Sequence, residues 1–316
     1  MEPNLYYRFL IIAVLCLGIQ INLKADELYD PYHLVSYNSK EEIPDPNAEI
    51  NENSSFFDSL CSFDEWPKEK KVVALNTLTI GTIATIGVIG WDYGSHSFRT
   101  ANEGWFDPDT SYGGADKLGH AFTCYALASV YNRIYKDWGY SDNDAILLGS
   151  VNSLLTMSAI EIGDGFSKSQ GYSWQDEIMN AVGAGMSYLR HRFPAIRERV
   201  DFRWEWFPSP AARRGDRFDI LTDYSGQKFL LAFKLDGWLR TGNPILKALD
   251  VQVGYYTRGY VSGDKSYFED THRYGYIGIG LNMTYLLERL TGHRAENVFD
   301  YVQVPYTYIS TSRGFD

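Results

Sequence analysis

The chain has 316 residues, of which 45% are hydrophobic, and this is enough to form a large core and to exclude global disorder. Its net charge of -11 disfavours nucleic acid as a partner, because no basic stripe offsets the repulsion from phosphates. Aromatic residues make up 16% of the chain and are frequent in its last third, a composition typical of exported, surface-associated β proteins.

Residues 1–25 have the pattern of a secretory signal peptide. An apolar run over 9–21 follows Arg8, and Ala25 ends a segment that fits a cleavage site. A lipoprotein alternative would place Cys16 at the new N-terminus, but the bulky Leu15 stands where a small residue is expected. Both alternatives predict an exported protein in the periplasm or associated with the outer membrane.

The sequence after the leader indicates an arm followed by a long apolar helix. Residues 26–66 are acidic, rich in Asn, Ser and Pro, and lack a sustained period, so we expect a partly ordered arm. Residues 72–91 contain no charge and are long enough to cross a bilayer. Their threonines and glycines fit a buried helix of a soluble bundle equally well.

Three further helices are expected to bring polar side chains together. Asp116 and His120 lie one helical turn apart, and Lys117 follows Asp116. For Asp116 alone, N-terminal capping is the simpler interpretation. A helix from about 142 to 162 carries Glu161 on its apolar stripe, where an unpaired carboxylate would be costly. We therefore expect Glu161 to face His120 or Lys117, with an exposed, frayed helix end as the alternative.

The third helix begins at Ser173, which with Asp176 matches a capping box. Asn180 shares its face, and Gly183 would let another helix approach closely. Cys124, in the first of these helices, is expected to be a small core residue and not a disulfide partner.

The spacing of these residues resembles a known family. The segments that carry the resemblance are Asp116-Lys117-x-x-His120, Glu161-x-x-Asp164-Gly165 and Ser173-Trp174-x-Asp176-x-x-x-Asn180-x-x-Gly183-Ala184. They resemble the YfiM-like family of predicted periplasmic lipoproteins and, more distantly, the VanZ-like family of membrane proteins. The resemblance covers about 91–193, and 223–229 also resembles longer members. It implies an envelope location and a helical domain, with no established activity.

The pattern changes from a helical period to a period of two in the C-terminal third. Residues 194–217 are charged and proline-containing and are expected to form a linker. After it, alternating segments such as 229–235 and 251–255 predict strands. Too few strands are predicted to close a membrane barrel, so an open sheet packed on the helices is favoured over a lipid-facing one. His272 and His293 are expected at the surface.

The sequence thus predicts an α+β protein. A helical bundle of about four helices over 67–193 would precede an antiparallel β-sheet of four to five strands over 218–316.

Three functions fit the polar residues. The favoured hypothesis is a structural or binding protein of the cell envelope, in which a buried polar network fixes the helices. The first alternative is a hydrolase of phosphate esters or glycans, with His120 as base or nucleophile, Asp116 or Glu161 orienting it, and Lys117 holding the anion. In both cases Asp164, Asp176 and Asn180 are expected to contribute binding groups.

The second alternative is a divalent-metal-binding protein that uses His120, Glu161, Asp164 and Asp176, although no recognised chelating motif is present. The sequence contains no established catalytic motif and identifies no cofactor. An envelope lipid, glycan or protein is the expected partner, with membrane association.

Overall fold

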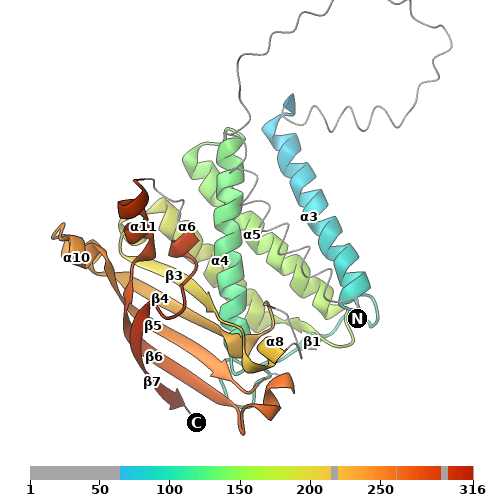
Figure 1. Ribbon diagram of the computed structural model, residues 1–316. Helices are drawn as coiled ribbons and strands as arrows, with labels where there is room; N and C mark the ends of the chain where they lie inside the picture. Colours follow the sequence, from blue (N-terminus) through green and yellow to red (C-terminus); the bar gives the residue numbers. More distant parts are fainter. Residues whose placement is uncertain (1–64, 215–219, 261, 293–297, 316) are drawn as a thin grey trace, which may run out of the picture. The chain divides into compact units, whose positions relative to one another are not determined.

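The computed structural model of the protein describes residues 65–214, 220–260, 262–292 and 298–315 (Figure 1). The chain divides into two compact units, one of residues 6–78 and one that includes 79–316, so the boundary falls within helix α3 (Lys68–Gly90). The predicted signal peptide, Cys16, most of the acidic arm, the start of the predicted β region and His293 lie outside the described residues.

Three long helices form the centre of the larger unit. They are α4 (Ala115–Asp137), α5 (Asp142–Gly165) and α6 (Trp174–Arg192). The Ser173 hydroxyl accepts a hydrogen bond from the Asp176 amide and caps α6, as predicted. Asp116 does not cap α4, because the N-cap is Gly114 in a left-handed conformation (φ 83°), which leaves Asp116 inside the first turn.

Small residues let these helices approach one another closely. A Cβ atom added to Gly183 would lie 2.0 Å from the Ala121 carbonyl oxygen, and one added to Gly149 would lie 2.7 Å from the backbone nitrogen of Asn132. The predicted role of Gly183 in close helix approach is therefore confirmed. Cys124 is a free, fully buried thiol in this packing, as expected of a core residue.

Two described helices, α3 and α5, are long and apolar enough to cross a membrane by length and composition. The α3 helix contains residues 72–90 of the uncharged segment and begins four residues earlier, with the charged residues 68–71.

A five-stranded antiparallel sheet follows the helices, which confirms the predicted α+β class. Its order is β3-β4-β5-β6-β7. The strands are β3 (Val200–Trp206), β4 (Gln227–Lys234), β5 (Leu249–Arg258), β6 (His272–Leu281) and β7 (Tyr308–Phe315). His272 opens β6 and is half-buried, so it is less exposed than expected.

The first strand lies within the segment 194–217 that was expected to be a linker. Asp201, Arg203 and Glu205 alternate along β3 and are all buried. Charged residues at every second position look like a solvated linker in the sequence, yet here they face the inside of the fold.

Short elements complete the described chain. They are β1 (Thr100–Ala101), β2 (Tyr172–Ser173), α7 (Pro194–Arg197), α8 (Pro210–Arg214), η3 (Tyr224–Gly226), α9 (Leu235–Leu239), α10 (Pro244–Lys247), η4 (Ser262–Ser266), α11 (Met283–Thr291) and η5 (Val298–Asp300).

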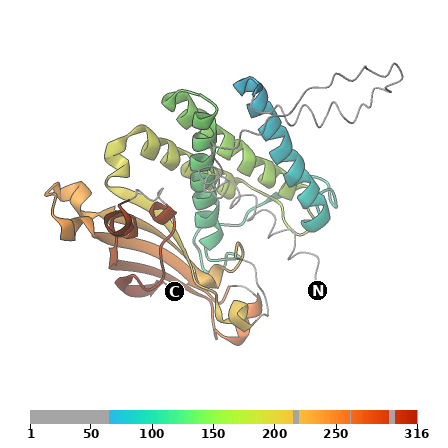
Figure 2. The same cartoon turned by 45° about the horizontal axis from the view of Figure 1, so that its top comes forward.

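Helix α4 lies between α5 and the sheet (Figures 1 and 2). Phe122 of α4 packs edge-on against Phe202 of β3, with ring centres 5.5 Å apart, and Tyr125 joins the same cluster. Phe229 of β4 completes the contact. This aromatic core fixes α4 on the first two strands of the sheet.

The opposite face of the first strands holds a buried ionic network. Arg203 donates to Asp201 and Asp250, each at 2.8 Å. Asp201 also lies 2.8 Å from the Lys234 ammonium and accepts a hydrogen bond from Arg190 of α6. The network therefore ties α6 to three neighbouring strands.

Candidate functional site

The polar residues singled out in the sequence come from three helix ends that meet. α5 leads into α6 through the segment 166–173, so the end of α5 and the start of α6 lie at one level, next to the start of α4. The first turns of α4 and α6 supply Asp116, Lys117 and Asp176, and the last turn of α5 supplies Glu161.

Lys117 is the centre of one half of this cluster. Its side chain has no exposed surface, and its ammonium lies 2.8 Å from both Asp116 and Asp176. A third carboxylate, Glu103, lies 2.5 Å away. Such a buried charge requires close partners, because an isolated ammonium would be strongly destabilised by the loss of water.

Glu103 was not identified from the sequence, because it lies in an irregular loop that shows no periodicity. The loop is held by β1, which pairs in parallel with β2 through Thr100–Tyr172 and Ala101–Ser173. Asn102 then accepts a hydrogen bond from Gln175 of α6. Burial and the neighbouring Asp176 carboxylate raise the pKa of Glu103, while Lys117 opposes this shift.

The other half of the cluster contains an imidazole, a carboxylate and an amide. His120 Nδ1 lies 3.4 Å from Glu161 Oε1 and 3.3 Å from Asn180 Oδ1. Glu161 is only 2% exposed, and its other oxygen accepts a hydrogen bond from the Ser173 amide at 3.3 Å. The prediction that Glu161 faces His120 is confirmed, and the exposed helix end is excluded.

Asp164 lies apart from both halves in its bonding. Its carboxylate forms a hydrogen bond with the Tyr93 hydroxyl, whose one hydrogen is shared with the Ile160 carbonyl oxygen 3.0 Å away. Six of the seven predicted residues therefore make direct polar contacts within the cluster, and the seventh is held at its edge by a tyrosine.

Two sets of side chains in the cluster have the geometry to hold a metal ion. The first is His120, Glu161 and Asp176, and the second is Glu103, Asp116 and Asp176; the potential ligand atoms of each set lie within 4.8 Å of one another. The Lys117 ammonium already provides the cation for the second set. The first set has only the His120 imidazole as a potential positive charge.

Comparison with known proteins gives one match to a protein family. Residues 102–192 match the family described as predicted periplasmic lipoprotein (DUF2279). The match begins beside Glu103 and ends at the last residue of α6, so it contains all the cluster residues described above. No curated protein and no solved structure matches the chain.

The family match confirms the resemblance seen in the sequence, and with it the expected location as an exported, periplasmic or membrane-associated protein. The signal peptide, lipidation at Cys16, the association with the outer membrane and the distant similarity to VanZ-like proteins stay predictions.

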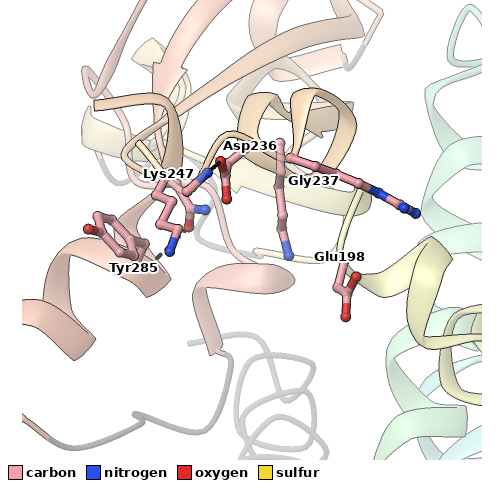
Figure 3. A pocket seen from close by; sticks show the side chains of 9 residues that line it. Glu198, Asp236, Gly237, Lys247 and Tyr285 are labelled. Atoms are coloured by element: carbon pink, nitrogen blue, oxygen red, sulfur yellow. Dashed lines mark hydrogen bonds between the residues drawn. The ribbon is translucent and has the colours of Figure 1, made fainter. Parts of the chain in front are cut away.

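A cavity of about 550 Å³ lies elsewhere, between β4, α9 and the start of α11. Lys247 and Tyr285 line one side of it and Glu198 the other (Figure 3). None of the cluster residues lines this cavity. The cluster itself is densely packed, and only Glu103 and His120 have side chains more than a fifth exposed among its ion-paired members.

Proposed function

We propose that this envelope protein has a binding role and that its helix-end cluster holds a divalent cation between His120, Glu161 and Asp176. The observation that carries the proposal is the position of Glu161. It is almost completely buried, and within the described residues it forms no ion pair with a lysine or arginine. A buried carboxylate needs a cation or a proton.

The charge of the whole cluster supports a cation. Glu103, Asp116, Glu161 and Asp176 face one ammonium and one imidazole. Lys117 can offset only part of this negative charge. A divalent ion at the first set, with His120 as a neutral ligand, would offset two of the three negative charges that Lys117 leaves.

The donor atoms also fit such an ion. Imidazole nitrogen and carboxylate oxygen bind transition-metal ions at about 2.0–2.2 Å, so two ligands of one ion lie at most about 4.4 Å apart. The potential ligand atoms of the first set lie within 4.8 Å of one another, so they would move closer together on binding an ion. Asn180, which is fully buried and has no hydrogen-bond partner for its amide nitrogen within the described residues, lies beside the set and offers an oxygen. One nitrogen with several oxygens suits manganese or zinc.

Limited access favours binding over hydrolysis. A phosphate ester or glycan must reach a catalytic group, whereas Lys117, Asp176 and Glu161 are nearly sealed from solvent. An ion entering past His120 needs far less space. The hydrolase hypothesis is therefore kept as an alternative outcome of the experiment.

The test uses the full chain purified in detergent, stripped with EDTA and titrated with Mn²⁺ and then Zn²⁺ by calorimetry. We expect one ion per chain and a loss of affinity of at least about tenfold in Glu161→Gln and His120→Ala. His96→Ala is the matched control, because this histidine is exposed and its imidazole contacts only the neighbouring Ser97 within the described residues. Circular dichroism establishes that each variant is folded.

Absence of saturable binding by the folded wild-type chain at millimolar metal would overturn the cation proposal. Hydrolysis of a phosphate ester that is lost in His120→Ala, but does not depend on metal, would assign the cluster to the hydrolase alternative.

A further inference from the structure

Helices α5 and α6 carry their large apolar side chains on the outside of the fold. On α5 the residues Leu147, Val151, Leu155 and Ile162 are 46–56% exposed and recur at the spacing of one helix face. On α6 the exposed residues are Trp174, Ile178, Val182 and Leu189, at 43–47%. The two helices pack side by side, so their stripes form one surface, which we call the α5–α6 face.

The buried sides of the same helices have the opposite character. The buried residues of α5 are mostly small or polar: Ala145, Ile146, Gly149, Ser150, Asn152, Ser153, Thr156, Met157, Glu161 and Gly165. Those of α6 are Gln175, Asp176, Asn180, Gly183, Ala184, Ser187 and Arg190. A helix of a water-soluble bundle has its large apolar residues inside and its polar residues outside. Both helices reverse this order.

Membrane helices pack in the manner seen here. In lipid, helix contacts are made by small residues and by polar side chains that bond across the interface, while large apolar residues face the acyl chains. The close contacts of Gly149 and Gly183 with α4 are of this kind. The Ser158 hydroxyl likewise donates to Glu177 across the α5–α6 contact.

Aromatic side chains mark both ends of the face. At the end that holds the cluster, Trp105 packs edge-on against Trp174 with ring centres 5.5 Å apart, and Phe98 packs against Phe166 at 5.2 Å. At the other end the half-buried Trp138 stands just before α5 begins, packed on the buried Tyr135. Tryptophan and tyrosine gather at the two boundaries of a bilayer, where one side of the ring meets lipid and the other meets water.

The length between these ends fits a bilayer. α5 has 24 residues, so at 1.5 Å per residue it is about 36 Å long, against a hydrocarbon thickness of about 30 Å. α6 has charged residues in both terminal turns, so its apolar part is shorter and lies beside the middle of α5. No charged residue occurs in α5 from Ala145 to Ile160. An exposed apolar surface of this extent is rare in a soluble monomer.

We propose that the α5–α6 face contacts the acyl chains of a bilayer, with the aromatic residues at its two ends at the lipid–water boundaries. This goes beyond the cation site and does not depend on it. The arrangement places the cluster at one boundary, where Glu103 and His120 reach water.

The test is site-directed spin labelling of the full chain in vesicles of phosphatidylethanolamine and phosphatidylglycerol. Labels are placed at Leu155→Cys and Val182→Cys on the face, and at Asp109→Cys on an exposed loop as control. The background carries Cys16→Ser, Cys61→Ser and Cys124→Ala, so a lipid attached at Cys16 cannot supply the membrane contact. Accessibility to oxygen, which concentrates in lipid, is compared with accessibility to a water-soluble nickel chelate.

We expect an oxygen-to-nickel accessibility ratio several-fold higher at 155 and 182 than at 109. Labels at 155 and 182 that are as accessible to nickel as the control would overturn the proposal. So would low accessibility to both reagents, since this result would assign the face to a second copy or another protein. The proposal would also be overturned if the folded chain did not associate with the vesicles.

Discussion

Lys117 Nζ and Asp176 Oδ1 lie 2.8 Å apart and join the first turn of α4 to the first turn of α6. Asp116 on the same turn of α4 and Glu103 on the preceding loop complete the surroundings of the ammonium. This single lysine therefore holds together three parts of the chain, of which the outer two, Glu103 and Asp176, lie 73 residues apart in sequence.

Lys117→Met should destabilise the fold strongly. Removing one partner of a buried ionic group leaves the others uncompensated, at a cost of about 3–5 kcal/mol in the free energy of unfolding. Denaturant unfolding followed by circular dichroism measures the change. Lys136→Met is the control, because its partner Asp142 is 81% exposed and such surface pairs contribute about 0–1 kcal/mol. Equal losses in the two variants would contradict a special role for Lys117.

Adding Glu103→Gln to the Lys117→Met variant should restore part of its lost stability. The pKa of Glu103 is raised by burial and by Asp176, so its ionised form already opposes folding above its ordinary pKa. Without the ammonium this penalty grows, and neutralising Glu103 should recover about 1 kcal/mol. A double-mutant cycle gives the coupling energy, and strictly additive effects would show that the two side chains do not interact.

Gly183→Ala should destabilise the helical packing, whereas Gly185→Ala should not. A methyl group at Gly183 would lie 2.0 Å from a backbone oxygen of α4, so the helices must separate, at about 1–3 kcal/mol. A methyl group at Gly185 meets nothing within 4 Å, and alanine favours the helix by up to about 1 kcal/mol. Thermal melting should show a lower melting temperature for Gly183→Ala and an unchanged or higher one for Gly185→Ala.

The Ser173 cap should affect cation binding as well as stability. Ser173→Ala and Ser141→Ala each remove a cap and should each cost about 1 kcal/mol. The Ser173 hydroxyl accepts from the backbone amide of Asp176, a proposed ligand, whereas Ser141 lies at the far end of α5. The backbone amide of residue 173 that donates to Glu161 is kept in Ser173→Ala. Only Ser173→Ala should weaken Mn²⁺ binding. Unchanged affinity in this variant would separate the cap from the proposed site.

The stability of the fold at acidic pH should depend on the ionic network of the sheet. Burial alone would raise the pKa of Asp201, but Lys234, Arg190 and Arg203 hold it below its ordinary value. For a lowered carboxylate pKa, the stabilisation is complete above the ordinary value of about 3.9 and disappears as the pH falls through the lower folded-state pKa. Asp201→Asn should therefore cost about 3–5 kcal/mol at neutral pH, and the difference from wild type should shrink below about pH 4.

Unfolding curves from pH 2.5 to pH 7 measure this convergence, with the exposed Asp109→Asn as control. A difference between wild type and Asp201→Asn that stays constant over this range would show that the carboxylate charge is not the source of the stabilisation.

The sequence predicted the cluster well because its members interrupt helical periodicity. Asn180 shares a face with Asp176, and both are buried as that spacing predicts. Glu161 is buried as expected, but for a different reason: Leu147 and Val151 of its apolar stripe are exposed, and the buried side of α5 is small and polar. Glu103 has no such signal, since its place depends on a two-residue strand pairing between distant segments. Long-range pairing of this kind leaves no local pattern.

The prediction of a linker over 194–217 was wrong because of its charged residues. The alternating Asp201, Arg203 and Glu205 indicated a solvated linker, but each meets an oppositely charged or polar partner inside the sheet region. A charged strand can be buried only when its partners are supplied by other strands, and a single sequence does not reveal those partners.

The short pairing of β1 with β2 is made by backbone groups, so it does not depend on what stands at position 117. Glu103 should keep its orientation even in a chain that lacks the ammonium. A small side chain at position 117 would then leave a cavity lined by the carboxylates of Glu103, Asp116 and Asp176. Methylammonium added to the solvent should bind in this cavity and restore the stability of the fold.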